Sequence, residues 1–247
     1  MSVYESIFLA AMKGKAKYAV LLDPDKLDEK SGYESARRCT DAGVDCLFVG
    51  GSTGERSRFV AVTHAIKSGA GIPLILFPGS AEHIVPHADA VLFMSLISGR
   101  NPRFLIDEPL KGVPAIRNAA LETIGMGYIL VESDKPSAVE RVSGTSPIKR
   151  DDFASAVNHS LMAQYFGMKV VYLEGGSGVE LPVPVQMVAE VRTALSVPLI
   201  VGGGIKTASA AKERVLAGAN VIVTGNVLEK TGLGANLDEF IEAIHSV

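Results

Sequence analysis

The fold of this chain is decided by two stretches, Val201-Gly202-Gly203-Gly204-Ile205-Lys206 and Val223-Thr224-Gly225-Asn226. Each follows a short β-branched run and precedes a helical pattern, and glycines there let backbone N–H groups approach an anion closely. A single glycine-rich turn is a weak signal. Two of them, ending consecutive strands late in the chain, are typical of the phosphate site at the last two strands of a (β/α)₈ barrel. The sequence therefore predicts a barrel that binds a phosphorylated ligand.

The rest of the chain alternates strands and helices. Continuous apolar runs bounded by turn residues, typical of strands buried on both faces, predict strands at 18–22, 46–49, 74–77, 90–94, 122–131, 169–173, 199–201 and 221–224. Helical patterns lie at 29–42, 56–68, 103–120, 151–166, 184–195, 208–217 and 237–246. Asp151 is the expected N-cap of the fourth of these helices, and Gly167 its stop. We expect residues 1–247 to form one α/β domain, a (β/α)₈ TIM barrel.

Three intervals depart from a regular alternation. Only twelve residues separate Phe77 from Ala90, so the third helix is expected to be reduced or missing. The resulting gap in the outer ring either admits an elongated ligand or is closed by a neighbouring element. Gly125-Met126-Gly127 predicts a bulge or a close ligand approach in the fifth strand. The polar segment 132–150 predicts a long loop at the end of the barrel where lids and substrate loops occur.

Composition excludes several classes of protein. The formal net charge of −3 gives no electrostatic reason to expect nucleic acid or an anionic membrane as a partner. Cys39 and Cys46, the only cysteines, lack a metal-binding or redox spacing and are expected to be buried thiols in a reducing compartment. No apolar run reaches the roughly 18 residues of a membrane span. We expect a soluble, cytoplasmic protein.

The first chemical constellation is Leu22-Asp23-Pro24-Asp25-Lys26, which ends the first strand. Carboxylates at this end of a barrel strand belong to the active-site face. Asp23 directly follows the apolar run and is the better candidate ligand for a hard cation such as Mg²⁺, which prefers oxygen ligands. Asp25 and Lys26 fit equally well as the start and cap of the next helix.

The second constellation is Gly50-Gly51-Ser52-Thr53-Gly54, which ends the second strand. Its glycines suit a diphosphate, and its hydroxyls offer an oxygen ligand beside Asp23. The alternative role, in which Ser52 or Thr53 caps the following helix, is compatible with the first.

The third constellation ends the sixth strand with Tyr172-Leu173-Glu174-Gly175-Gly176-Ser177-Gly178. Alternation along a strand puts Tyr172 and Glu174 on the same side, toward the barrel mouth. A carboxylate opposite two phosphate loops can hold the hydroxyls of a glycerol or sugar phosphate. Glu174 is therefore the candidate general base.

Together the motifs LDPDK, GGST, YLEGGSG, VGGGIK and TGN, in this order, resemble the geranylgeranylglyceryl phosphate synthase family of prenyltransferases, and the resemblance covers essentially the whole chain. It implies an enzyme that joins sn-glycerol 1-phosphate to a polyprenyl diphosphate, for which geranylgeranyl diphosphate is expected. The product is an ether lipid precursor, and diphosphate is released with the help of Mg²⁺. The resemblance also implies a reduced third helix and a prenyl chain that runs along the side of the barrel.

The resemblance assigns roles to particular residues. Catalytic roles fall to Glu174, Tyr172 and Asp23, and Mg²⁺ binding to Asp23 and Ser52. Binding of the glycerol phosphate falls to Tyr172, Leu173, Glu174, Gly175, Gly176, Ser177, Gly178, Gly203, Gly204, Gly225 and Asn226.

In one place the chain departs from shorter relatives. Some of these relatives carry a lysine two residues before the first aspartate, where this chain has Leu21, so a phosphate contact is lost. The chain length and the 132–150 loop indicate the longer branch of the family. Membership of that branch implies a homo-oligomer larger than a dimer, such as a hexamer, and release of the product implies transient contact with a membrane.

Two rival functions share the phosphate loops. An isomerase or synthase of phosphorylated precursors on the same scaffold usually needs acidic residues on the first and fifth strands or a lysine base. The end of the fifth strand, from Tyr128 to Val131, shows no acidic residue until Glu132. A non-catalytic barrel would bind a phosphorylated metabolite without turnover.

Overall fold

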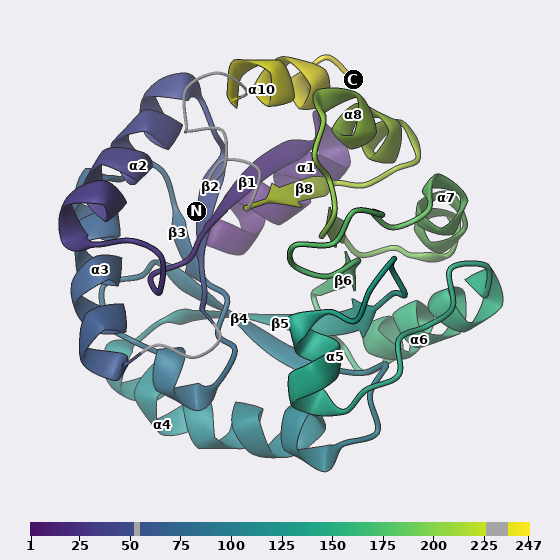
Figure 1. The fold of residues 1–247 in the computed structure, drawn as a ribbon, viewed down its shortest axis with the longest axis horizontal. Helices are drawn as coiled ribbons and strands as arrows, with labels where there is room; N and C mark the ends of the chain where they lie inside the picture. Colours follow the sequence, from purple (N-terminus) through teal and green to yellow (C-terminus); the bar gives the residue numbers. More distant parts are fainter. Residues whose placement is uncertain (52–54, 226–236) are drawn as a thin grey trace.

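The computed structural model of the chain describes residues 1–51, 55–225 and 237–247. Eight parallel strands form a closed barrel in sequence order, with β8 paired to β1 (Figure 1). The strands are β1 (Lys17–Leu22), β2 (Cys46–Val49), β3 (Leu74–Leu76), β4 (Ala90–Leu96), β5 (Glu122–Leu130), β6 (Val170–Glu174), β7 (Leu199–Gly202) and β8 (Val221–Thr224). The predicted TIM barrel is confirmed.

An outer ring of helices surrounds the strands. It consists of α2 (Glu29–Ala42), α3 (Arg56–Gly69), α4 (Glu108–Ala119), α6 (Phe153–Tyr165), α7 (Val185–Ala194), α8 (Ala208–Leu216) and α10 (Leu237–His245), and the short π-helical segment η3 (Arg103–Asp107) leads into α4. Within the described residues, no helix combines the length and the apolar character that crossing a bilayer requires.

The connection between β3 and β4 contains only the short 3₁₀ turn η2 (Ala81–His83), as predicted for the third helix. Helix α4 packs closely against this turn, since a Cβ at Gly112 would collide with the Ile84 side chain. The backbone N–H of Ala81 also donates to Glu108 at 3.1 Å. Helix α4 thus supports the thin part of the outer ring, the β3–β4 connection where a third helix is absent.

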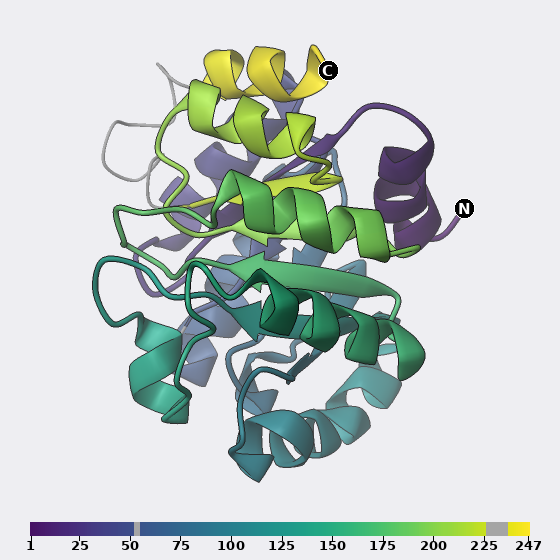
Figure 2. The same ribbon diagram turned by 90° about the vertical axis from the view of Figure 1, so that its right-hand side faces the viewer.

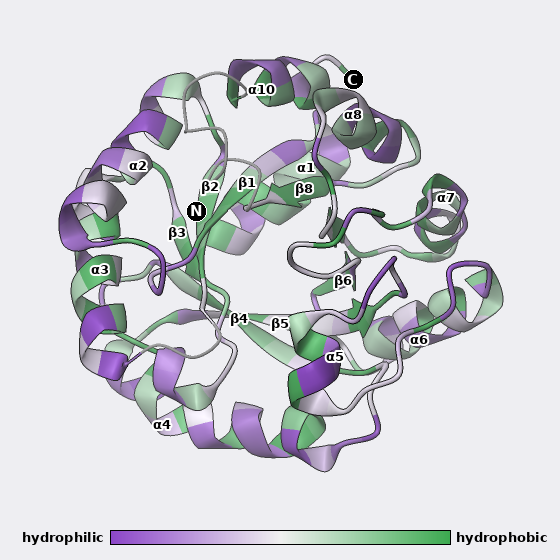
Figure 3. Cartoon of the chain, in the orientation of Figure 1, coloured by the Kyte–Doolittle hydropathy of each residue, from purple (hydrophilic) through white to green (hydrophobic). Residues whose placement is uncertain are grey.

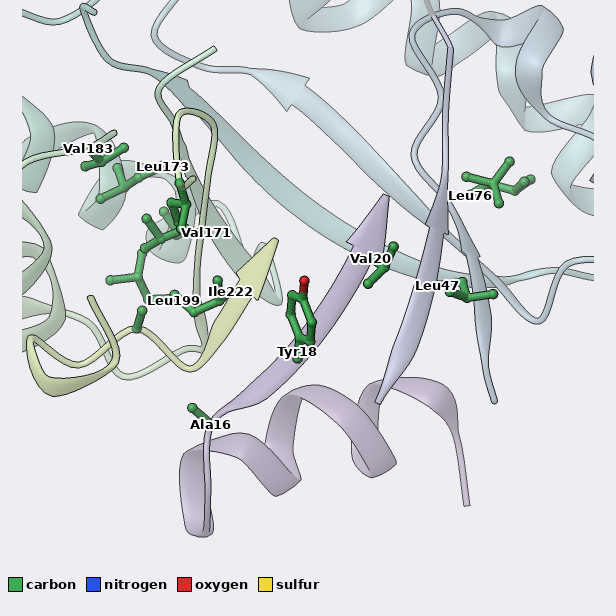
Figure 4. Close-up of a cluster of buried hydrophobic side chains, with 14 of the residues drawn as sticks. Ala16, Tyr18, Val20, Leu47, Leu76, Val171, Leu173, Val183, Leu199 and Ile222 are labelled. Carbon is green, nitrogen blue, oxygen red and sulfur yellow. The ribbon is translucent and has the colours of Figure 1, made fainter. Parts of the chain in front are cut away.

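Two apolar layers hold the barrel together. The strands are mostly green in Figure 3, whereas the outer helices alternate between hydrophobic and hydrophilic residues. One layer lies between strands and outer helices and includes Val171, Leu173, Leu199 and Ile222 (Figure 4). The other fills the barrel interior with the alternate residues of the same strands, such as Tyr172. The period-2 alternation expected along β6 is therefore present.

A helical segment that the sequence reading missed closes the far end of the barrel. It consists of η1 (Tyr4–Leu9) and α1 (Ala10–Lys13), whose Ile7, Phe8 and Ala11 join the interior apolar layer. The backbone N–H groups of Val3 and Tyr4 donate to Glu122 at the start of β5, at 2.7 and 2.9 Å. Figure 2 shows this segment at one end of the barrel and the loops that follow the strands at the other. Ligands therefore reach the interior from the carboxyl ends of the strands.

Two local expectations need correction. The N-cap of α6 is Asp152, whose carboxylate accepts from the Ser155 N–H at 3.0 Å, so the Asp151 assignment was wrong by one residue. Gly167, at φ +79°, ends that helix as expected. Strand β5 pairs without a bulge, and Gly127 is small because a Cβ there would collide with Ala163 of α6. Helix packing, and not a ligand, accounts for this glycine.

The segment 132–150 is not a plain loop. It contains the short helix α5 (Ala138–Ser143), capped by Ser137, whose Oγ accepts from the Glu140 N–H at 3.1 Å. The sequence Ser137-Ala138-Val139-Glu140 carries the S-x-x-E signal of a helix start. The signal was therefore present in the sequence and was overlooked.

Candidate active site

A cavity of about 470 Å³ opens at the carboxyl ends of the strands. One end is formed by the glycine loops after β6, β7 and β8, and the side next to it by Asp23 and Gly51 after β1 and β2. The other end runs past η2 to α4 and α5 and is lined by apolar side chains: Ile84, Phe93, Met94, Phe104, Val139 and Val142. The cavity is thus polar at one end and apolar at the other, as an amphipathic ligand requires.

The loop after β7 packs closely against the segment that follows β6. Gly203 and Gly204 have φ of +79° and +71°, which side-chain-bearing residues rarely adopt. A Cβ on Gly203 would collide with Glu174 Oε1, and one on Gly204 would lie 2.8 Å from Pro182 N. Within the described part of the chain, the N–H groups of Gly204 and Gly225 donate to no acceptor. These N–H groups are available to an anion in the cavity.

Glu174 is the buried acid of the site. Its side chain accepts from the Gly176 N–H at 2.6 Å, and the residue is only 6% exposed. Burial raises the pKa of its carboxyl, and hydrogen bonds from the Gly176 N–H and from the Tyr172 and Tyr128 phenols oppose that rise. A buried carboxylate that lines a cavity and has a raised pKa is suited to accept a proton near neutral pH.

Asp23 and Asp25 converge beside the cavity. A Cβ built on Gly51 would lie 3.1 Å from Asp23 Oδ1 and 3.0 Å from Asp25 Oδ2, so a side chain there would fill the space between loop and carboxylates. The Asp25 N–H donates to Asp23 Oδ1 at 3.0 Å, and Lys26 Nζ lies 3.3 Å from Asp23 Oδ2. Helix α2 is capped by Asp28 and α3 begins after Glu55. The capping roles considered for Asp25 and Lys26 are therefore wrong, and those considered for Ser52 and Thr53 lie outside the described residues.

The donor set beside Gly51 fits a hard divalent cation. Among the described residues, no group of three or more His, Cys, Asp or Glu side chains forms a complete metal cage. Mg²⁺, however, is usually held by one or two carboxylates and completes its shell with water and substrate phosphates. Asp23, which lines the cavity, meets that requirement. Ser52, the other expected ligand, lies outside the described residues.

The remaining predicted binding residues divide into two groups. Those that line the cavity are Tyr172, Glu174, Gly176, Ser177, Gly178, Gly203, Gly204 and Gly225. The side chain of Leu173 points instead into the outer apolar layer (Figure 4), and the Gly175 N–H donates to Gly202 O at 2.9 Å. Leu173 and Gly175 do not line the cavity, and their assignment as binding residues stays a prediction. Asn226 lies outside the described residues.

The 132–150 segment rests on the loop after β6. Asp134 Oδ1 accepts from the N–H groups of Glu180 and Leu181 at 2.7 and 3.2 Å, and Ser133 Oγ donates to Leu181 O at 2.8 Å. These backbone hydrogen bonds lower the pKa of Asp134 to about 2. Because Leu181 also packs against Gly204, the segment supports the polar end of the cavity.

Several lining residues escaped sequence reasoning. Tyr128 stands opposite Tyr172 in the β5–β6 register, and both lie near Glu174. This pairing could have been found by applying the β6 alternation to β5. The apolar wall had no such signal, since Ile84, Phe104 and Val139 are brought together only by the folded chain.

Comparisons with known proteins agree with this geometry. The model of the PcrB family matches residues 11–246. A geranylgeranylglyceryl phosphate synthase of Chitinophaga pinensis is 38% identical over 245 residues, which cover 99% of this chain and 96% of that protein. The protein of the same name from Korarchaeum cryptofilum is 41% identical over 229 residues, or 92% and 94% of the two chains.

Solved structures extend the similarity to three dimensions. The crystal structure of (S)-3-O-geranylgeranylglyceryl phosphate synthase from Thermoplasma acidophilum, in complex with substrate sn-glycerol-1-phosphate, superposes with a TM-score of 0.95. It is 35% identical, and the match covers 100% of both chains. A thiamine phosphate pyrophosphorylase from Pyrococcus furiosus, at 13% identity and a TM-score of 0.60, shares the fold alone.

Proposed function

The chain belongs to the PcrB family, and from that premise we propose that it joins sn-glycerol 1-phosphate to geranylgeranyl diphosphate. It is an enzyme, a prenyltransferase of ether-lipid synthesis similar to the geranylgeranylglyceryl phosphate synthases. The observation that carries the substrate assignment is the cavity itself. Its polar end offers glycine N–H groups and Glu174, and its opposite end is a wall of apolar side chains.

Glycerol phosphate binding falls to the loops after β6, β7 and β8. The phosphate accepts hydrogen bonds from the N–H groups of Gly204 and Gly225, which have no acceptor among the described residues. Lys206, the one cationic side chain among the described residues that line the cavity, stands at its rim and pairs with Glu180. The glycerol hydroxyls face the Glu174 carboxylate. Fixing both ends of so small a substrate orients its 3-hydroxyl, and orientation supplies much of the acceleration.

The bond changes are those of an allylic substitution. The bond between the allylic carbon and the diphosphate oxygen breaks, and its electron pair leaves with the diphosphate. A lone pair of the glycerol 3-hydroxyl oxygen forms the new C–O bond, and the hydroxyl proton passes to Glu174. Its raised pKa makes the carboxylate a stronger base than an exposed glutamate. Tyr172 and Tyr128 hold that carboxylate in place.

A divalent cation, for which Mg²⁺ is proposed, would be held by Asp23 together with Ser52. When bound, such a cation neutralises the negative charge of the departing diphosphate. The prenyl chain lies along the apolar wall between β4, α4 and α5. A homo-oligomer larger than a dimer, a cytoplasmic location and transient membrane contact remain predictions, of which light scattering tests the first.

The test is a direct assay. Radiolabelled sn-glycerol 1-phosphate, geranylgeranyl diphosphate and Mg²⁺ are incubated with the enzyme and extracted with butanol. Label in the organic phase is the expected result, and sn-glycerol 3-phosphate, the mirror-image substrate, is the matched control. Absence of organic label with prenyl diphosphates of every common length would instead favour the isomerase or synthase alternative.

A further inference from the structure

Three aromatic rings meet across the mouth of the barrel. Phe77 follows β3, and its ring stacks on Tyr172 of β6 with centroids 5.6 Å apart and planes at 13°. It also meets the edge of Tyr128 of β5 at 5.8 Å and 64°, and the two tyrosine rings lie 5.3 Å apart. All three residues line the cavity, and we call them the aromatic cage.

The aromatic cage connects the two chemical ends of the site. On one side Phe77 adjoins the loop after β2, since a Cβ on Gly50 would collide with the Phe77 carbonyl oxygen. The next residue, Gly51, touches Asp23. On the other side Tyr172 and Tyr128 lie against Glu174. The aromatic cage therefore lies beside both the Asp23 side and the Glu174 side of the cavity.

The rings of the cage keep their neutral electronic character. Burial, together with the neighbouring Glu174 charge, raises the pKa of both tyrosine phenols well above their ordinary value. The phenols are occupied by the Glu174 carboxylate, whereas Phe77 has no polar group to satisfy. The faces of neutral aromatic rings carry partial negative charge and attract cations, most strongly where water is excluded.

From this geometry we propose that Phe77 is a further catalytic residue, whose ring stabilises the positive charge that develops on the allylic carbon. The inference rests on the proposed function, because only cleavage of an allylic diphosphate generates that charge. As the C–O bond breaks, its electron pair leaves with the diphosphate, and the carbon is electron-poor until the glycerol oxygen bonds to it. Tyr172 and Tyr128 hold the Phe77 ring in place.

A purely structural Phe77 makes a different prediction from a catalytic one. A packing residue serves through its volume, so leucine would replace it with a small loss of stability. A charge-stabilising residue serves through its ring, so leucine would slow the chemical step while both substrates still bind. A desolvated cation–π contact corresponds to about a 30-fold change in rate.

The experiment is a single-turnover measurement on the full-length enzyme with Phe77→Leu. We expect the rate of ether formation to fall about 30-fold, with the KM of each substrate within about threefold of wild type. Phe240→Leu is the matched control, because Phe240 is buried in the outer apolar layer, its ring stacks on Tyr18, and it does not line the cavity. It should lower the melting temperature and leave the single-turnover rate unchanged.

A second series separates the ring's charge from its shape. Phe77 is replaced by phenylalanine analogues with one, two and three ring fluorines, which nearly preserve size but progressively weaken the negative ring face. The logarithm of the rate should fall stepwise along the series. A flat series, or a Phe77→Leu enzyme as fast as wild type, overturns the proposal. If wild-type enzyme forms no ether product, the proposed function itself fails, and that outcome is seen before any variant is made.

Discussion

Glu174→Gln tests the acid–base chemistry of the site most directly. The carboxylate accepts the Gly176 N–H at 2.6 Å and faces the phenols of Tyr172 and Tyr128. A glutamine of the same shape keeps the Gly176 hydrogen bond through its amide oxygen. Its NH₂ group cannot accept from the phenols, so those two hydrogen bonds are lost or reversed.

Two effects of this substitution differ in size. A typical hydrogen bond contributes about 1 kcal/mol net, so two rearranged hydrogen bonds should raise the glycerol-phosphate KM by roughly 30-fold at most. Loss of a general base costs about 10²- to 10⁴-fold. The expected result is therefore a kcat that falls 10²- to 10⁴-fold with a much smaller change in KM. The prenyl diphosphate, held on the Asp23 side, should keep its affinity.

The pH profile supplies an independent readout. Because burial raises the pKa of Glu174, wild-type kcat should fall with decreasing pH through a value above that of an exposed glutamate. The Gln variant should lack this acidic limb. Steady-state assays from about pH 5 to 9 with both enzymes measure it. A variant that keeps wild-type kcat while its glycerol-phosphate KM rises steeply would show that Glu174 only binds substrate. The proton would then leave by another route.

Three further outcomes are expected. Asp23→Asn should nearly abolish turnover and weaken Mn²⁺ binding, measured by calorimetry, because an amide is a poor ligand for a hard cation. If the variant turns over within threefold of wild type at limiting Mg²⁺, Asp23 is not a metal ligand. Gly204→Val, at φ +71°, should raise the Kd of glycerol phosphate far more than that of the prenyl diphosphate, and an equal loss for both would indicate a global effect on stability. A raised folded-state pKa means that wild-type stability falls as pH rises from the ordinary glutamate value through that of buried Glu174. The melting temperature of Glu174→Gln relative to wild type should therefore be higher at about pH 7 than at about pH 4, and scanning calorimetry at both values decides this.

Local signals in the sequence were sufficient for most of the barrel. Strand β2 and helix α2 have the predicted bounds, because a continuous apolar run and an amphipathic pattern before Gly43 are short-range features. The polar end of the site was predictable for a related reason. Parallel strands bring their carboxyl ends to one edge, so Asp23, Glu174 and Gly203 had to meet there once the barrel was inferred.

What could not be read from the sequence depends on contacts between distant segments. The N-terminal segment was missed because its ten residues are short for a helix and are stabilised by packing inside the barrel and by Glu122, more than a hundred residues away. The apolar wall and the aromatic cage likewise combine residues of β4, β5, β6, η3, α5 and the connection after β3. A sequence pattern within one segment cannot predict contacts between segments that are far apart in the chain.

The thin part of the outer ring also marks the weakest seam of the barrel. Strands β3 and β4 are joined in register at only two positions, Ile75↔Ala90 and Leu76↔Val91, whereas β4 and β5 pair continuously from Ala90↔Glu122 to Leu96↔Tyr128. Short pairing with little helical cover favours local opening, and amide hydrogen exchange should be faster along this seam than along β5. A prenyl chain lying against Val91 and Ile84 would contact both β4 and the connection between β3 and β4. While bound, it would stabilise the short β3–β4 pairing. Binding of the prenyl substrate should then slow amide hydrogen exchange in β3 and β4, because the bound ligand adds apolar contacts where the protein provides few.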